Sequence, residues 1–104
     1  MENEDVSWQD LVHQHVRTFG TFAMVGNSTE AIRTLETIEE IVRAAVNLDE
    51  LPKSAHLDVR ALADRVHPHI VLRRQTRASA IVDLALREAG ILPRDAAVLR
   101  IAAA

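Results

Sequence analysis

Five histidines are the side chains of this 104-residue chain best suited to metal binding. His13 and His15 stand two residues apart in a predicted helix, so they point to different faces and cannot chelate one ion together. His67 and His69 flank a proline, and in an extended turn alternate residues share a face, so this pair with Asp64 is a candidate metal site. The alternative is that both are surface residues beside a helix-ending proline. We favour the surface interpretation and expect no metal and no cofactor.

Glu36, Glu39 and Glu40 form the closest group of carboxylates that a helix would bring to one face. Paired acids can perform hydrolysis, but a solvated helix face carries the same residues, and the sequence places no second carboxylate opposite them. No serine lies in a nucleophile-elbow motif, and no glycine-rich phosphate loop is present. We therefore predict that the protein is not an enzyme, and we infer no small-molecule substrate.

Arg73, Arg74 and Arg77 form a basic cluster within the segment RRQTR. They belong to a wider division of charge along the chain. Residues 1–52 contain ten acids and three bases, whereas residues 53–104 contain nine bases and five acids. A split of this kind indicates charged partners, or contact between one half of the molecule and the other.

The first hypothesis is a non-catalytic protein–protein interaction or adaptor module that docks through complementary acidic and basic helical surfaces. The basic surface would consist of Arg73, Arg74 and Arg77, and the acidic surface of Glu36, Glu39 and Glu40. The partner would be a larger charged protein, or further copies of the chain docked head to tail.

The second hypothesis is a small DNA-binding regulator, because residues 58–89 have the general layout of a helix-turn-helix. Its contacts would come from Arg73, Arg74, Thr76 and Arg77. Three features oppose it: a predicted connector of about eight residues against a usual turn of three or four, a following helix rich in Ala, Ile, Val and Leu, and a net charge of −3. The basic half also lacks any aromatic residue for base stacking.

Composition indicates one ordinary globular domain over residues 1–104. Apolar residues make up 48% of the chain and charged residues 26%, and cysteine is absent. The acidic start is unlike a targeting peptide, and no apolar run approaches the roughly 20 residues that span a bilayer. We expect a cytoplasmic protein without a membrane partner, with a flexible segment at 1–6 and a frayed one at 102–104.

The elements that position these residues are predicted to be helices, because apolar residues recur at helical spacing between scarce glycines and prolines. We predict an all-α, compact bundle of four to five helices. The helices are expected from Ser7 to a break bracketed by Gly20 and Gly26, from Asn27 to Asn47, from Asp58 to Val66, from Gln75 or Thr76 to Ala89, and from Pro93 to Ile101.

Three details of this bundle are further expectations. The second helix, about 30 Å long, is expected to be the spine along which the others pack. Pro68 should stop the third helix, and Gly90 should end the fourth in a left-handed cap. The conformation of residues 67–75 is left open between an extended connector, a helical turn and a strand.

Overall fold

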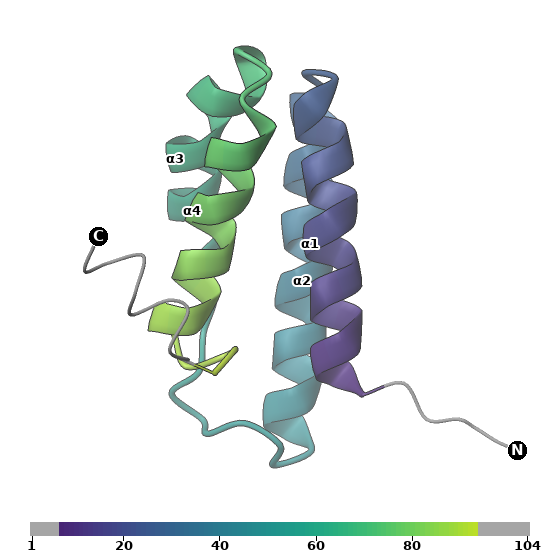
Figure 1. Ribbon diagram of the computed structural model, residues 1–104. Helices are drawn as coiled ribbons and strands as arrows, with labels where there is room; N and C mark the ends of the chain where they lie inside the picture. The colour runs from purple at the N-terminus through teal and green to yellow at the C-terminus, as the bar shows by residue number, and fades with distance from the viewer. Residues whose placement is uncertain (1–6, 94–104) are drawn as a thin grey trace, which may run out of the picture.

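The computed structural model describes residues 7–93, which form four helices and no strand. The helices are α1 (Trp8–Met24), α2 (Ser28–Asn47), α3 (Val59–Val71) and α4 (Gln75–Glu88), and they alternate in direction along the bundle (Figure 1). The predicted all-α bundle is confirmed for this part of the chain. Residues 94–101 of the predicted fifth helix, and the segments 1–6 and 102–104, lie outside it. None of the four helices is both long enough and apolar enough to cross a membrane.

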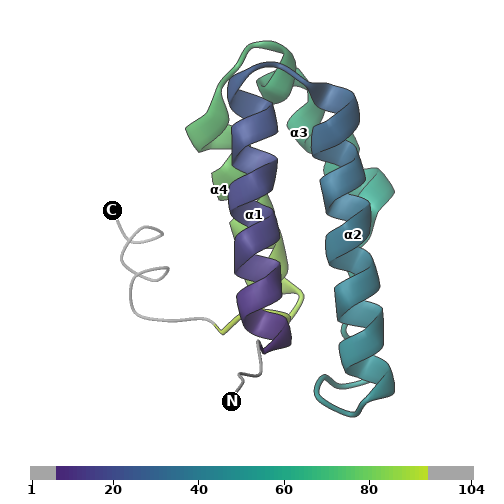
Figure 2. The ribbon, with the colours of Figure 1, turned by 90° about the vertical axis from the view of Figure 1, so that its right-hand side faces the viewer.

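Each helix packs mainly on two neighbours, so that α1, α2, α3 and α4 form a ring. Figures 1 and 2 show α1 beside α2 and α3 beside α4. Buried side chains from all four helices form one core. The expectation that α2 is the spine is wrong, because α4 packs against α1 and α3 rather than along α2. The largest fully buried side chains are Phe19, Leu35, Ile38, Ile70, Leu86, Ile91 and Leu92.

Side-chain caps fix the starts of α1, α2 and α3. In each case an oxygen of the residue before the helix accepts a hydrogen bond from the backbone N–H three residues on. The capping residues are Ser7, Asn27 and Asp58, at 3.1, 3.2 and 3.1 Å. Such caps satisfy amides that have no partner inside the helix. The predicted starts of the first two helices are confirmed.

The end of α4 follows the predicted glycine cap. Gly90 has a φ of +77°, a left-handed conformation that costs glycine little. The chain then turns back, and the N–H of Ile91 donates to the carbonyl of Leu86 at 2.9 Å. Ile91 and Leu92 are both buried, so the cap directs two apolar side chains into the core.

Pro68 does not stop α3, which continues to Val71. The predictions of a helix ending at Val66 and of a connector of about eight residues are therefore wrong. A proline inside a helix removes one hydrogen bond and costs about 3 kcal/mol. Ile70 is fully buried, one turn beyond the equally buried Val66, and continuing the helix keeps it in the core. Only residues 72–74 remain to connect α3 to α4.

Gly20 does not mark a break either, because α1 passes through it and ends at Met24. Its position reflects close packing of α1 on α4. A Cβ atom added at Gly20 would lie 3.0 Å from Ser79 Oγ and 3.1 Å from Gln75 Nε2. The missing side chain of Gly20 therefore lets the two helices approach each other.

The bundle has two unlike ends (Figures 1 and 2). At one end, which we call the tip, the α1–α2 turn (25–27) meets the α3–α4 turn (72–74). The two turns touch: a Cβ atom at Gly26 would lie 3.3 Å from Arg73 Nε. The opposite end, which we call the open end, contains the start of α1, the end of α2 and the long connection 48–58.

Candidate docking surfaces

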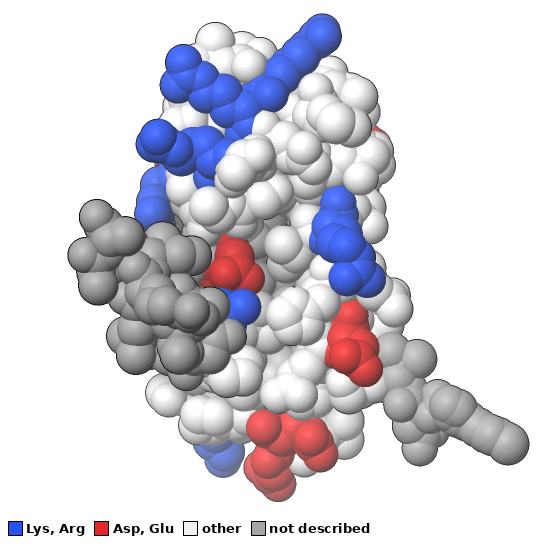
Figure 3. All heavy atoms as spheres, in the orientation of Figure 1, with Lys and Arg blue, Asp and Glu red and all other residues white. Residues whose placement is uncertain are grey.

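The structure brings the three predicted arginines together at the tip. Arg73 lies in the α3–α4 turn, Arg74 is the N-cap residue of α4 and Arg77 lies in the first turn of that helix. All three are exposed, and none forms an ion pair with another residue of the part 7–93. In Figure 3 Lys and Arg side chains gather at this end of the molecule. Thr76, the fourth residue of the DNA hypothesis, is also exposed in the first turn of α4.

Exposed apolar side chains accompany the arginines. Six large hydrophobic residues are exposed among residues 7–93, and four belong to the tip: Met24 (51%), Val25 (56%), Val71 (56%) and Leu72 (59%). Scattered exposed hydrophobics are ordinary, but apolar groups gathered at one end and flanked by arginines are typical of an interaction surface. The sequence could not reveal this, because Met24, Val71 and Leu72 fit the apolar pattern of helices as well as any core residue.

The tip arginines occupy positions that local structure disfavours. Arg73 has a φ of +56°, a region that usually takes glycine or asparagine. Arg74 makes no side-chain cap, unlike the residues that begin the other three helices. Together with Arg77 they place three positive charges at the positive end of the α4 dipole. The first turns of α1 and α2 instead carry Asp10 and Glu30.

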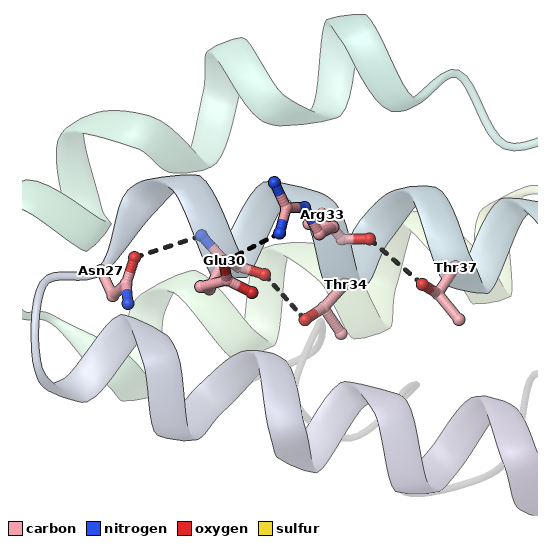
Figure 4. Close-up of polar contacts among 5 residues, drawn as sticks. All are labelled: Asn27, Glu30, Arg33, Thr34 and Thr37. Carbon is pink, nitrogen blue, oxygen red and sulfur yellow. Dashed lines mark hydrogen bonds and ion pairs between the residues drawn. The ribbon is translucent and has the colours of Figure 1, made fainter.

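The start of α2, which also lies near the tip, satisfies its own polar groups (Figure 4). Asn27 caps the helix, and Arg33 donates to Glu30 at 3.1 Å. The hydroxyls of Thr34 and Thr37 donate to backbone carbonyls one turn earlier, at 2.8 and 3.3 Å. Arg33 is therefore already paired. Of the basic residues near the tip, Arg73, Arg74 and Arg77 are the ones without an ion pair inside the described part of the chain.

The predicted acidic residues lie farther along α2, away from the tip. Glu36 and Glu40 are exposed, whereas Glu39 is half-buried and forms an ion pair with Arg43. Glu36 and Glu39 line one wall of a groove of about 510 Å³ between α2 and the start of α3. The opposite wall contains Asp58, Arg60 and Asp64 among others, so this groove carries mixed charge.

The histidine pair does not have the geometry that a shared metal site needs. His67 and His69 lie inside α3, where residues two apart point in different directions, so the extended turn assumed for them is wrong. His67 Nδ1 lies 2.8 Å from Ser28 Oγ and ties α3 to the start of α2. His69 Nδ1 is buried and has no hydrogen-bond partner within residues 7–93. No group of three or more His, Asp or Glu suited to a metal ion exists within residues 7–93.

The open end carries an apolar pocket that the sequence did not indicate. It has a volume of about 550 Å³ and lies between the start of α1 and the end of α2. Its apolar walls include Trp8, Leu11, Ile41, Ala44 and Leu48, and its polar lining includes Glu50. Leu48 is 73% exposed, more than any other large hydrophobic residue of the described chain.

Several acidic residues belong to the same region as this pocket. Glu50 lines it, and the exposed Asp10 and Asp49 are next to lining residues in the sequence. Glu40 stands one turn before Ala44, on the same face of α2. The bundle therefore has a basic, apolar tip at one end and an acidic, apolar pocket at the other.

Comparison of the chain with protein-family models, with curated proteins and with solved structures gave no match.

Proposed function

We propose that this protein is a non-catalytic protein-interaction module, an adaptor that docks through its tip onto an acidic surface of a partner. The contact would combine the apolar side chains of the two turns with Arg73, Arg74 and Arg77. The predicted acidic residues Glu36, Glu39 and Glu40 offer a second, separate surface along α2. A module with two such surfaces can connect two partners.

The placement of the tip arginines carries this proposal. A sequence selected for stability alone would have a capping residue at position 74 and glycine or asparagine at position 73. Residues that depart from local preference without a structural benefit are expected at functional sites. An acidic partner would offset the repulsion among these arginines, and the neighbouring apolar groups would exclude water from the contact.

The test is affinity purification with the tagged protein from its native cells, comparing wild type with the variant Leu72→Glu/Arg74→Glu. Both positions are exposed, so the variant should keep its fold by circular dichroism. A matched control, Arg65→Glu/Leu84→Glu, makes the same chemical changes on the sides of α3 and α4. Wild type and control should retain the same protein partners, and the tip variant should lose them.

High salt should weaken the same contacts, because screening reduces attraction between exposed charges. Recovery of identical proteins by all three baits would contradict the proposal.

One observation favours the DNA hypothesis as the second candidate. The connection between α3 and α4 has three residues, within the usual length of a helix-turn-helix turn. However, α3 and α4 run side by side in opposite directions (Figure 1), and beyond Arg77 the outward residues of α4 include Ala80, Leu84 and Glu88. These residues offer little to read base edges. Salt-dependent binding of duplex DNA, abolished by Arg74→Glu/Arg77→Glu, would support this alternative.

A further inference from the structure

We propose that one partner of the tip is a second copy of this chain, which receives the tip in the acidic pocket at its open end. The inference rests on the proposed function and specifies its partner and its acceptor site. Repeated from molecule to molecule, this contact would join copies of the chain head to tail.

The two ends match in the kinds of groups that they present. The tip offers Met24, Val25, Val71 and Leu72, each more than half exposed. The pocket offers a concave apolar wall of about 550 Å³ that includes Trp8 and Leu48. Apolar groups at the centre of an interface supply most of its affinity, and aromatic residues are frequent there.

The charges around these apolar groups have opposite signs. The tip has the exposed Arg73, Arg74 and Arg77. The pocket is lined by the carboxylate Glu50, and the exposed Asp10, Glu40 and Asp49 lie within one residue or one helical turn of residues that line it. Positive and negative rims attract one another and fix the orientation of two docking proteins. Two tips would repel each other, as would two pockets, so the charge pattern favours tip-to-pocket contact.

The groove between α2 and α3 is a poorer acceptor for the tip. It includes Glu36 and Glu39, but Glu39 is already paired with Arg43, and Arg60 contributes a positive charge to the same lining. Among the described residues that line the open-end pocket, none is basic. Of the two concavities, the pocket is therefore more nearly complementary to the tip.

The position of the two surfaces determines the form of the assembly. They lie at opposite ends of one bundle (Figure 1), so filling the pocket of one molecule leaves that molecule's own tip free. A contact between two different surfaces extends indefinitely unless a rotation closes it into a ring. We expect chains whose length increases with protein concentration and falls with salt.

The test is sedimentation velocity on wild type and on two end variants. The tip variant is Leu72→Glu/Arg74→Glu, and the pocket variant is Leu48→Lys/Glu50→Lys. All four positions are exposed, so each variant should remain folded. Wild type should form a concentration-dependent series of species, and each variant alone should associate at least about tenfold more weakly.

An equimolar mixture of the two variants provides the decisive measurement. The tip variant keeps an intact pocket, and the pocket variant keeps an intact tip, so the mixture has one functional pair of surfaces. It should form a one-to-one dimer and no larger species. The control Arg65→Glu/Leu84→Glu should assemble as wild type does.

Three outcomes would overturn the inference: wild type that is monomeric at every concentration, end variants that assemble like wild type, or a mixture that stays monomeric. Wild type that is monomeric but binds anionic phospholipid vesicles through Leu72 and Arg74 would overturn it in favour of a membrane surface. The proposed adaptor function is tested separately. Loss of a different protein partner by the tip variant would uphold that function even where self-association fails.

Discussion

The tip and the open end of this bundle are built by different means. At the tip, two connections of three residues each turn the chain sharply, and each contains one residue with positive φ, Gly26 or Arg73. At the open end, the connection 48–58 is long enough to wrap over the core and buries Leu51, Ala55 and Leu57. The loop of the open end thus covers apolar surface but leaves Leu48 exposed, whereas the tip leaves four large apolar side chains in solvent.

The two ends therefore present different groups to solvent. Within residues 7–93, the tip combines several exposed hydrophobics with uncapped, like-charged residues, whereas the open end presents a pocket that Glu50 helps to line.

The largest expected effect on stability distinguishes a buried residue near the tip from an exposed one. Ile70→Ala removes a fully buried side chain from the last turn of α3, and we expect a loss of about 2–5 kcal/mol in the free energy of unfolding. Leu72→Ala, two residues away but 59% exposed, should change it by less than about 0.5 kcal/mol. Urea denaturation measures both. Equal losses would mean that Leu72 is part of the core and not of a docking surface.

The next comparison concerns the glycines with positive φ at the two ends. Gly26 and Gly90 have φ values of +76° and +77°, so alanine should cost about 1–2 kcal/mol at either position. At Gly26 the new Cβ would also press on Arg73 Nε, 3.3 Å away, whereas a Cβ at Gly90 would meet no other atom of residues 7–93 within 4 Å. Gly26→Ala should therefore be the more destabilising change in thermal unfolding. Equal effects would show that Arg73 moves away without cost.

Substitutions of the N-cap residues at the two ends should change the stability of the protein in opposite directions. Asp58→Ala removes the cap of α3 at the open end and should lower stability by about 1 kcal/mol. Arg74→Asp supplies a cap to α4 and replaces a positive charge at its start, so it should raise stability by about 1 kcal/mol. The same Arg74→Asp change should weaken partner binding. A stabilised variant with unchanged binding would show that Arg74 does not contribute to partner binding.

The smallest effect should come from the ion pair on the exposed side of α2. Arg43→Ala breaks the contact with Glu39 but should change the free energy of unfolding by less than about 0.5 kcal/mol, because exposed pairs of this spacing contribute little. Chemical denaturation at low and high salt measures it. A loss above about 1 kcal/mol would mean that charge interactions on this side of α2 contribute substantially to the stability of the bundle.

Local chemistry made most of the fold predictable. Ser7 and Asn27 correctly predicted the starts of two helices, and Gly90 predicted the end of a third, because a helix cap depends on only a few neighbouring residues. The predictions that a helix ends at Pro68 and breaks at Gly20 were wrong because tertiary packing determines the structure at both positions. Burial of Ile70 stabilises α3 beyond the proline, and the close approach of α4 favours glycine at position 20 inside α1.

For the candidate surfaces, the sequence predicted the charged residues but not the apolar residues beside them. Arg73, Arg74 and Arg77 are adjacent in sequence, so their clustering followed directly from the chain. The apolar residues of the tip come from two turns that are far apart in sequence. Trp8 and Leu48, which line the pocket, are likewise far apart in sequence. The contact of His67 with Ser28 spans 39 residues, and no local pattern signals it.

Pro68 also has a consequence for motion at the tip. Proline has no amide hydrogen, so the carbonyl of Asp64 lacks its usual partner, and the last turn of α3 is joined to the rest of the helix by one hydrogen bond fewer. Segments held by fewer bonds open at lower free energy than the core of a domain. In native-state hydrogen exchange we expect the amides of residues 69–74 to exchange before those of residues 62–66. The tip would then open locally and adjust to a partner while the bundle beneath it stays closed.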